Sequence, residues 1–210
     1  MTKQQKTIIQ KVSQHINKLF SDGEASHDWH HIRRVWKNAQ YIGKKENANL
    51  YVVELAALLH DIADSKFHRG SFTAGPRRAK ALLKKYGIDN DTMKEVLYVV
   101  GNISFKKAGT RKNMKTVEGQ VVQDADRLDA LGAIGIARAF AYGGYRYRPL
   151  YNPKTKHDDS TLDHFTHKIL HLKKLMNTKT GRQIAVQRDK VVRRYLQQFH
   201  KEWSGKDYKK

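Results

Sequence analysis

The chain has 210 residues and no cysteine, and 41 lysines and arginines against 20 aspartates and glutamates give it a formal charge of +21. The missing cysteines exclude disulfides, thiolate metal ligands and cysteine nucleophiles. The length predicts a single domain, residues 1–210, with its own core. The excess of positive charge favours a phosphorylated small molecule as partner and also admits nucleic acid; a solvated, self-repelling surface explains the charge equally well.

The N-terminus, MTKQQKTIIQ, lacks the apolar segment of a signal peptide. No stretch of the sequence approaches the roughly 20 apolar residues that a membrane-spanning helix needs. We therefore expect a cytoplasmic protein without a membrane partner. The sequence gives no basis for predicting an oligomeric state.

Apolar residues recur at helical spacing through the first half of the chain and predict helices over 3–20, 28–47, 50–63, 76–86 and 89–103. Asp28 and Asp89 are the expected N-caps of the second and fifth helices. The helix over 50–63 is apolar almost all round, which is typical of the central helix of a bundle.

The second half begins with an expected long helix over 117–142, rich in alanine and glycine towards its end. A proline-containing segment over 143–159 follows and is a candidate lid. Two closing helices are expected over 161–176 and 181–203. Because no stretch alternates polar and apolar residues, the sequence predicts an all-α fold, a single bundle of about eight helices.

Three short stretches carry candidate chemistry: HDWHHIRRV over 27–35, LLHDIADSK over 58–66 and VVQDADRLDALG over 121–132. His60 and Asp61 end the buried helix, and Asp64 follows His60 by four positions, so the three residues can border one patch of surface. An imidazole beside a carboxylate suits a divalent metal ion.

Taken in order, the three stretches read H-x-x-R-V, H-D and A-D-R-L. This pattern resembles that of the HD superfamily of metal-dependent phosphohydrolases, and in particular its small single-domain bacterial members. The resemblance implies an all-helical bundle in which four residues ligate the metal: His31, His60, Asp61 and Asp126.

Neighbouring residues compete for two of these positions. His30 and His31 point about 100° apart on a helix, so both cannot readily bind one ion, and His31 has the spacing of the family motif. Asp124 and Asp126 point to opposite faces of their helix, so only one should be a ligand. Asp129, three positions after Asp126, is expected to form a surface ion pair; contact with a metal ligand is the alternative.

Two imidazoles and two carboxylates favour one Mn²⁺, Fe²⁺ or Mg²⁺ ion over a closed zinc site. The resemblance assigns catalysis to Asp61, as a ligand, and to Asp64, as the general acid or base for the attacking water. Asn102 stands where some relatives have a histidine, which argues against a second metal ion.

Six residues are candidates for contact with a substrate phosphate; solvated loops or surface pairs are the alternative explanation for each. They are His27, Arg34, Lys66, Lys106, His164 and Lys168.

We therefore expect hydrolysis of a phosphoester or phosphoanhydride bond in a nucleotide. The resemblance suggests a (deoxy)nucleoside triphosphate cut to monophosphate and pyrophosphate. A nucleotidase or a guanosine-tetraphosphate hydrolase would use the same ligands. The alternative from another class is a nucleic-acid-binding helical protein with a non-catalytic metal site.

Overall fold

The computed structural model describes residues 1–20, 28–62, 74–103, 114–154 and 159–208. These residues form nine α-helices and one 3-10 helix, and they contain no β-strand. The predicted all-α class is confirmed. The chain divides into two compact units, Met1–Asp126 and Arg127–Lys210, and the prediction of a single domain stays a prediction.

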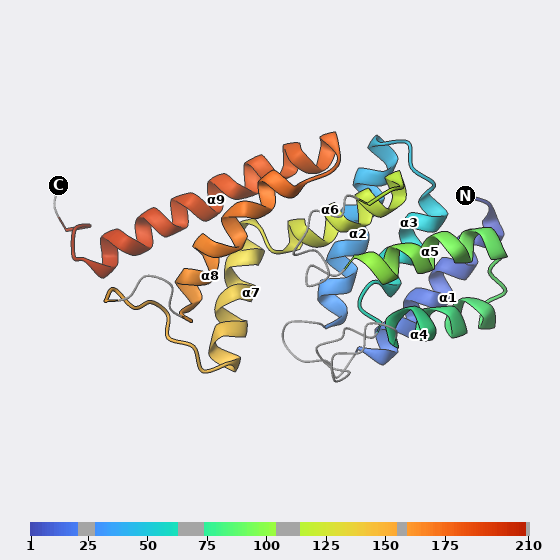
Figure 1. Cartoon of the computed structure of the whole chain (residues 1–210), viewed down its shortest axis with the longest axis horizontal. Helices are drawn as coiled ribbons and strands as arrows, with labels where there is room; N and C mark the ends of the chain where they lie inside the picture. The colour runs from blue at the N-terminus through green and yellow to red at the C-terminus, as the bar shows by residue number, and fades with distance from the viewer. Residues whose placement is uncertain (21–27, 63–73, 104–113, 155–158, 209–210) are drawn as a thin grey trace. The chain divides into compact units, whose positions relative to one another are not determined.

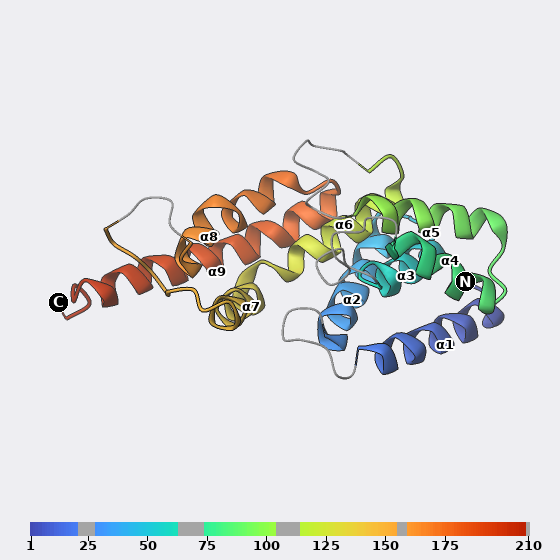
Figure 2. The same ribbon diagram turned by 60° about the horizontal axis from the view of Figure 1, so that its bottom comes forward.

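The first unit is organised around α3 (Leu50–Leu59), whose residues from Tyr51 to Leu59 are all buried. Figures 1 and 2 show α3 among α1 (Lys3–Leu19), α2 (Trp29–Lys45) and α5 (Asn90–Asn102), each of which packs against it. α4 (Ala74–Lys85) packs against α5. The near-continuous apolar character of α3 therefore matches its central place.

The starts of these helices follow the capping signals of the sequence. The Asp28 carboxylate accepts a hydrogen bond from the backbone N–H of His31 at 2.8 Å, and Asp89 accepts one from Thr92 at 2.9 Å. This bond lowers the pKa of Asp89 below its usual value. Both residues are N-caps, as predicted.

The second unit packs α7 (Gly132–Tyr145) and η2 (Ile169–Leu175), the 3-10 helix, against the long α9 (Lys179–Trp203). α8 (Thr161–His167) contacts α7 and η2. The aromatic side chains of Phe140, Phe165 and Tyr195 lie with ring centroids 5.8–6.5 Å apart and form part of this core.

Asp189 is a buried charge in this unit. Its Oδ2 atom accepts hydrogen bonds from Lys173 Nζ at 2.7 Å and Arg193 Nε at 2.8 Å. Burial by itself raises the pKa of Asp189, but the bonds from Arg193 and Lys173, and their charges, together bring the pKa below its usual value. The carboxylate thereby links η2 to α9.

Three predicted helices are wrong in extent. The expected helix over 50–63 ends as α3 at Leu59, and residues 60–62 form a turn. The expected helix over 117–142 is two helices, α6 (Val117–Asp129) and α7, because Gly132 adopts a left-handed backbone with φ of 74°. The expected helix over 161–176 ends as α8 at His167 and continues as η2 after Lys168, whose φ and ψ of −129° and −58° interrupt the α-helix. No described helix is long and apolar enough to cross a membrane.

Candidate metal centre

Four side chains of the first unit converge from three parts of its fold. His31 lies in the first turn of α2, His60 is the C-cap of α3, Asp61 follows it, and Asp126 lies on α6. The N-cap bond from Asp28 fixes the turn that carries His31. The end of the apolar α3 thus delivers the His60–Asp61 pair to the start of α2.

The polar atoms of these residues lie within a few ångströms of one another. The Nε2 atoms of His31 and His60 are 3.3 Å apart, and each lies 3.4 Å from Asp61 Oδ2. Asp126 Oδ1 is 3.6 Å from His31 Nε2 and 3.9 Å from His60 Nε2. His31, His60 and Asp126 also satisfy the spacing of a metal-binding group.

The tautomer of His60 is set by the backbone of its own helix. His60 Nδ1 lies 2.8 Å from the carbonyl oxygen of Ala57. Because a carbonyl oxygen can only accept, Nδ1 carries the proton, and in the neutral ring the lone pair of Nε2 points into the cluster. Metal-binding histidines are commonly oriented by such a bond.

The cluster fits one divalent ion. Bond lengths of about 2.0–2.2 Å to nitrogen and oxygen place neighbouring ligand atoms about 2.8–3.6 Å apart, for angles between about 90° and 109° at the ion. Four of the five measured separations, at 3.3–3.6 Å, lie at the upper end of that range. Two imidazoles and two carboxylates are ligand types that such an ion accepts. The histidine side chains are 1–2% exposed, whereas those of Asp61 and Asp126 are 14% and 37% exposed, so the group is open on its carboxylate side.

The structure distinguishes the competing neighbours. His31 is buried in the cluster, whereas His30 is exposed. Asp126 reaches the histidines, whereas Asp124 is fully buried. Asp129 forms an ion pair with Arg138 at 2.8 Å, but its side chain is buried, so the expectation of a surface pair is wrong in that respect.

The structure describes three of the other predicted site residues. Arg34 is half-buried on α2, one turn beyond His31. His164 and Lys168 lie at the end of α8 in the second unit, where the Lys168 N–H donates to the His164 carbonyl. His27, Asp64, Lys66 and Lys106 lie outside the described residues, as does the middle of the candidate lid.

One contributor to the site was missed. Glu54 of α3 is 3% exposed, and its Oε2 atom accepts hydrogen bonds from Trp36 Nε1 at 2.8 Å and Gln40 Nε2 at 2.7 Å, both on α2. These bonds hold together the two helices that carry His31 and His60. A single acidic residue inside the apolar run LYVVELAALL was the available signal, because a buried carboxylate needs partners.

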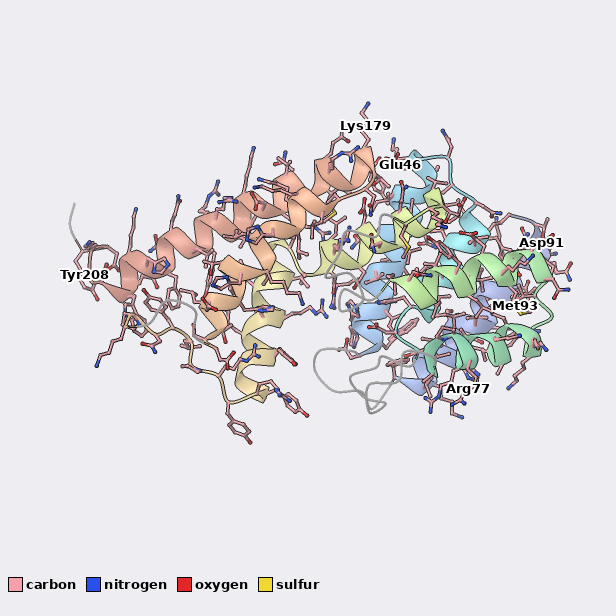
Figure 3. All side chains as sticks on the ribbon, in the orientation of Figure 1. Glu46, Arg77, Asp91, Met93, Lys179 and Tyr208 are labelled. Carbon is pink, nitrogen blue, oxygen red and sulfur yellow. The ribbon has the colours of Figure 1, made fainter. Side chains whose placement is uncertain are left out.

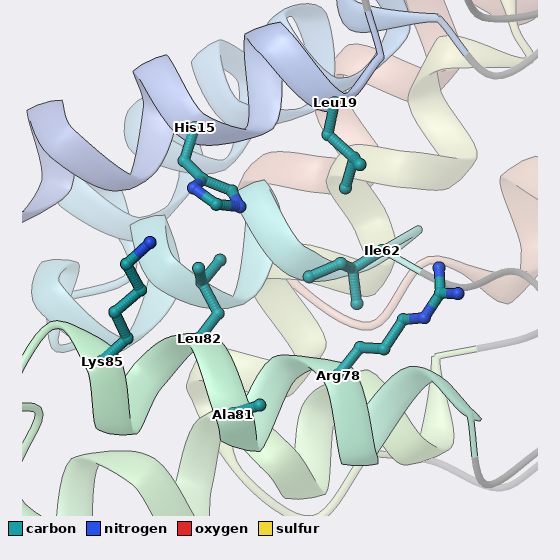
Figure 4. Close-up of a pocket in the computed structure, with 7 residues that line it drawn as sticks. All are labelled: His15, Leu19, Ile62, Arg78, Ala81, Leu82 and Lys85. Carbon is teal, nitrogen blue, oxygen red and sulfur yellow. The ribbon is translucent and has the colours of Figure 1, made fainter.

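A separate pocket of about 430 Å³ lies between α1 and α4. Figure 4 shows that its wall combines apolar side chains with basic ones, and none of the four converging residues lines it. Ile62, which directly follows Asp61, forms part of the wall. The full lining is His15, Leu19, Ile62, Arg78, Ala81, Leu82 and Lys85.

Comparison with known proteins gives a consistent family. Residues 28–131 match the family model of the HD domain. The uncharacterized protein YpgQ of Bacillus subtilis is 38% identical over 193 residues, which cover 91% of this chain and 92% of that protein. A crystal structure of an HD-superfamily hydrolase from Bacillus thuringiensis is 40% identical, with a TM-score of 0.80, and covers 95% of this chain and 98% of its own.

A crystal structure of B. subtilis YpgQ in complex with ADP also matches, with 36% identity and a TM-score of 0.77 over 95% of this chain and 96% of that one. Proteins can share a fold with much lower sequence identity, so identity at this level over nearly the whole chain indicates membership of one family. The chain belongs to the HD superfamily of hydrolases.

Proposed function

We propose that the protein is a metal-dependent phosphohydrolase that acts on a nucleotide. The observation that carries this proposal is the convergence of two imidazole nitrogens and two carboxylate oxygens at separations of 3.3–3.9 Å. Such a mixed nitrogen and oxygen set, open on one side, leaves positions for water and substrate.

His31, His60, Asp61 and Asp126 would hold one Mn²⁺, Fe²⁺ or Mg²⁺ ion. When bound, the ion supplies Lewis-acid polarisation of phosphoryl oxygens and lowers the pKa of a coordinated water. His60 contributes a preset tautomer through its bond to Ala57. Asp61 and Asp126 contribute the negative charge that retains a divalent cation.

Asp64 is proposed to transfer the proton of the attacking water. It follows His60 by four positions and Asp61 by three in the sequence, and this short separation supports a place for its carboxylate near the two ligands. Arg34, one helical turn beyond His31, is proposed to bind a substrate phosphate, and His27, Lys66, Lys106, His164 and Lys168 are further candidates for that role.

The proposed substrate is a (deoxy)nucleoside triphosphate, and the proposed products are the monophosphate and pyrophosphate. The ADP complex of YpgQ supports a nucleotide ligand, and the charge of +21 favours polyanionic substrates. A nucleotidase would instead release inorganic phosphate, and a guanosine-tetraphosphate hydrolase would release pyrophosphate from the 3′ position.

Product analysis separates these reactions. The purified protein is incubated with nucleoside mono-, di- and triphosphates and with guanosine tetraphosphate, in Mn²⁺, Fe²⁺ or Mg²⁺, and the products are resolved by anion-exchange chromatography. We expect monophosphate and pyrophosphate in equal amounts from triphosphates, and no turnover with a chelator. Inorganic phosphate as the sole small product would replace this substrate assignment with a nucleotidase. Turnover that survives the chelator would contradict metal-dependent hydrolysis.

A further inference from the structure

One exposed stripe of α9, called here the basic row, carries four basic side chains among its seven positions. Positions 179, 183, 186, 190, 194, 197 and 201 follow one another at spacings of three or four residues, so they fall within one narrow stripe of the helix. All seven are exposed, and no acidic residue is among them. The row is Lys179, Gln183, Val186, Lys190, Arg194, Gln197 and Lys201.

The four cations of this row have no neutralising partner among the described residues. Lys173 and Arg193 pair with the buried Asp189, but no ion pair reaches Lys179, Lys190, Arg194 or Lys201. The surrounding unit has the same sign of charge, since Arg127–Lys210 contains 19 lysines and arginines against 7 aspartates and glutamates. The row is therefore a strip of uncompensated positive charge. Figure 3 shows Lys179 projecting outwards at the start of α9.

The opposite side of α9 is already occupied within its own unit. Ala185, Val192 and Leu196 are buried, and α9 packs against α7 and η2. An amphipathic helix that binds a membrane surface inserts its apolar face between lipids. The exposed large apolar residues of α9 are Val186, Val191 and Trp203. They point about 120° apart around the helix and therefore form no such face.

The dimensions of the row match a linear polyanion. From residue 179 to residue 201 the helix rises about 33 Å, at 1.5 Å per residue, which is close to one turn of a nucleic-acid duplex of about ten base pairs. Phosphates recur along a duplex at short, regular intervals. Lysine, arginine and glutamine are side chains that commonly contact them.

We propose that the basic row of α9 is a binding surface for the phosphodiester backbone of a nucleic-acid duplex. The proposed contacts are to backbone phosphates, which carry no sequence information, so binding is governed by release of counterions. DNA and RNA duplexes share this backbone chemistry. The row belongs to the unit Arg127–Lys210, whereas the residues of the candidate metal centre belong to Met1–Asp126, and the proposal does not depend on hydrolysis.

The test measures binding of the full chain to duplexes of about 20 base pairs by fluorescence anisotropy over a range of salt concentrations, with and without chelator. The variant Lys190→Gln/Arg194→Gln removes two cations from the row. The variant Lys3→Gln/Lys6→Gln removes two exposed cations from α1 and is the matched control for net charge. Circular dichroism establishes that both variants keep the helical content of the parent chain.

Each phosphate contact contributes about 0.9 to the slope of log K against log salt. We expect the slope of Lys190→Gln/Arg194→Gln to be shallower by about 1.8, with chelator present or absent, and that of the control to stay at the parental value. DNA and RNA arms identify which duplex is preferred. A parental slope in the α9 variant, an equal loss in both variants, or equally tight binding to anionic lipid vesicles would overturn the proposal.

Discussion

Glu54 is a buried carboxylate in the most apolar helix of the protein, and it accepts hydrogen bonds from Trp36 and Gln40 through one oxygen, Oε2. Because Trp36 and Gln40 lie on α2 and Glu54 lies on α3, these bonds join the two helices that deliver His31 and His60. Loss of the acceptor would leave two partly buried donors without a hydrogen-bond partner. Each unsatisfied donor lowers the stability of the folded protein.

We expect Glu54→Ala to lower the free energy of unfolding by about 2–3 kcal/mol, from the two unsatisfied donors. Glu54→Gln keeps a carbonyl oxygen at the same place, and since both bonds go to one oxygen, it should lose much less. Urea unfolding followed by circular dichroism measures both variants. Equal stability of Glu54→Ala and the parent chain would contradict the role given to this network.

Asp64→Asn tests proton transfer. A general acid or base typically contributes about 10²–10⁴-fold to a rate, so we expect turnover to fall by that factor. Metal content should stay at the parental level, because the amide replaces a carboxylate that is not proposed as a ligand. Steady-state kinetics and elemental analysis give the two readouts. A parental rate would remove Asp64 from proton transfer, and loss of the metal would make it a ligand.

The residues that meet at the candidate centre could be predicted from the sequence. The hydrogen bonds that position these residues could not. The 100° step between His30 and His31, and the opposite faces of Asp124 and Asp126, follow from helix geometry alone. In the structure His31 and Asp126 lie in the cluster, and their binding of a metal ion stays a prediction. The bond from His60 to the Ala57 carbonyl involves a backbone atom and leaves no trace in residue types. Partners of Glu54 come from another helix, so spacing along the chain does not reveal them.

The break between α6 and α7 is the largest departure of an element from its predicted course. The apolar and small residues continue through it, and a glycine inside a helix costs only about 1 kcal/mol relative to alanine, so periodicity gives no reason to stop. Gly132 adopts a left-handed conformation, and a Cβ atom added to it would lie 3.2 Å from Arg188 Cγ of α9, so the neighbourhood of this glycine is set by tertiary structure. The predicted helix over 161–176 is interrupted at Lys168, and the apolar periodicity of the sequence does not reveal this interruption either.

Two adjacent glycines of α7 provide a matched test of its packing. A Cβ atom on Gly143 would lie 2.0 Å from Thr161 Oγ1 of α8, whereas a Cβ atom on Gly144 would meet nothing within 4 Å. We expect Gly143→Ala to destabilise the chain by about 1–3 kcal/mol, as overpacking does. Gly144→Ala should be neutral or stabilise it by up to about 1 kcal/mol. Thermal unfolding of both variants decides the matter, and equal effects would contradict the close approach of α7 and α8.

At the scale of the whole molecule, the candidate ligands and the basic row belong to different compact units. His31, His60, Asp61 and Asp126 fall within Met1–Asp126, and α9 falls within Arg127–Lys210. Metal binding adds stability only to the parts of the chain that unfold together with the ligands. Calorimetry in the presence and absence of metal therefore tests the predicted single domain.

We expect one cooperative transition. Its midpoint should fall by about 5–10 °C when the metal is removed, because saturation at 100 times Kd is worth about 2.7 kcal/mol and a chain of this length shifts by about 2–4 °C per kcal/mol. Differential scanning calorimetry with and without chelator makes the measurement. Two transitions, of which only one moves with the metal, would show that the units unfold separately and that the single-domain prediction is wrong.

The central claim is that one divalent ion held by His31, His60, Asp61 and Asp126 drives hydrolysis of a nucleotide. The most direct measurement combines elemental analysis and turnover of Asp61→Ala with those of Asp91→Ala, which removes an exposed acid from α5. We predict that Asp61→Ala folds, loses its metal and does not hydrolyse nucleotides, while Asp91→Ala keeps one ion and the parental rate. An Asp61→Ala variant with parental metal content and parental turnover would contradict the claim.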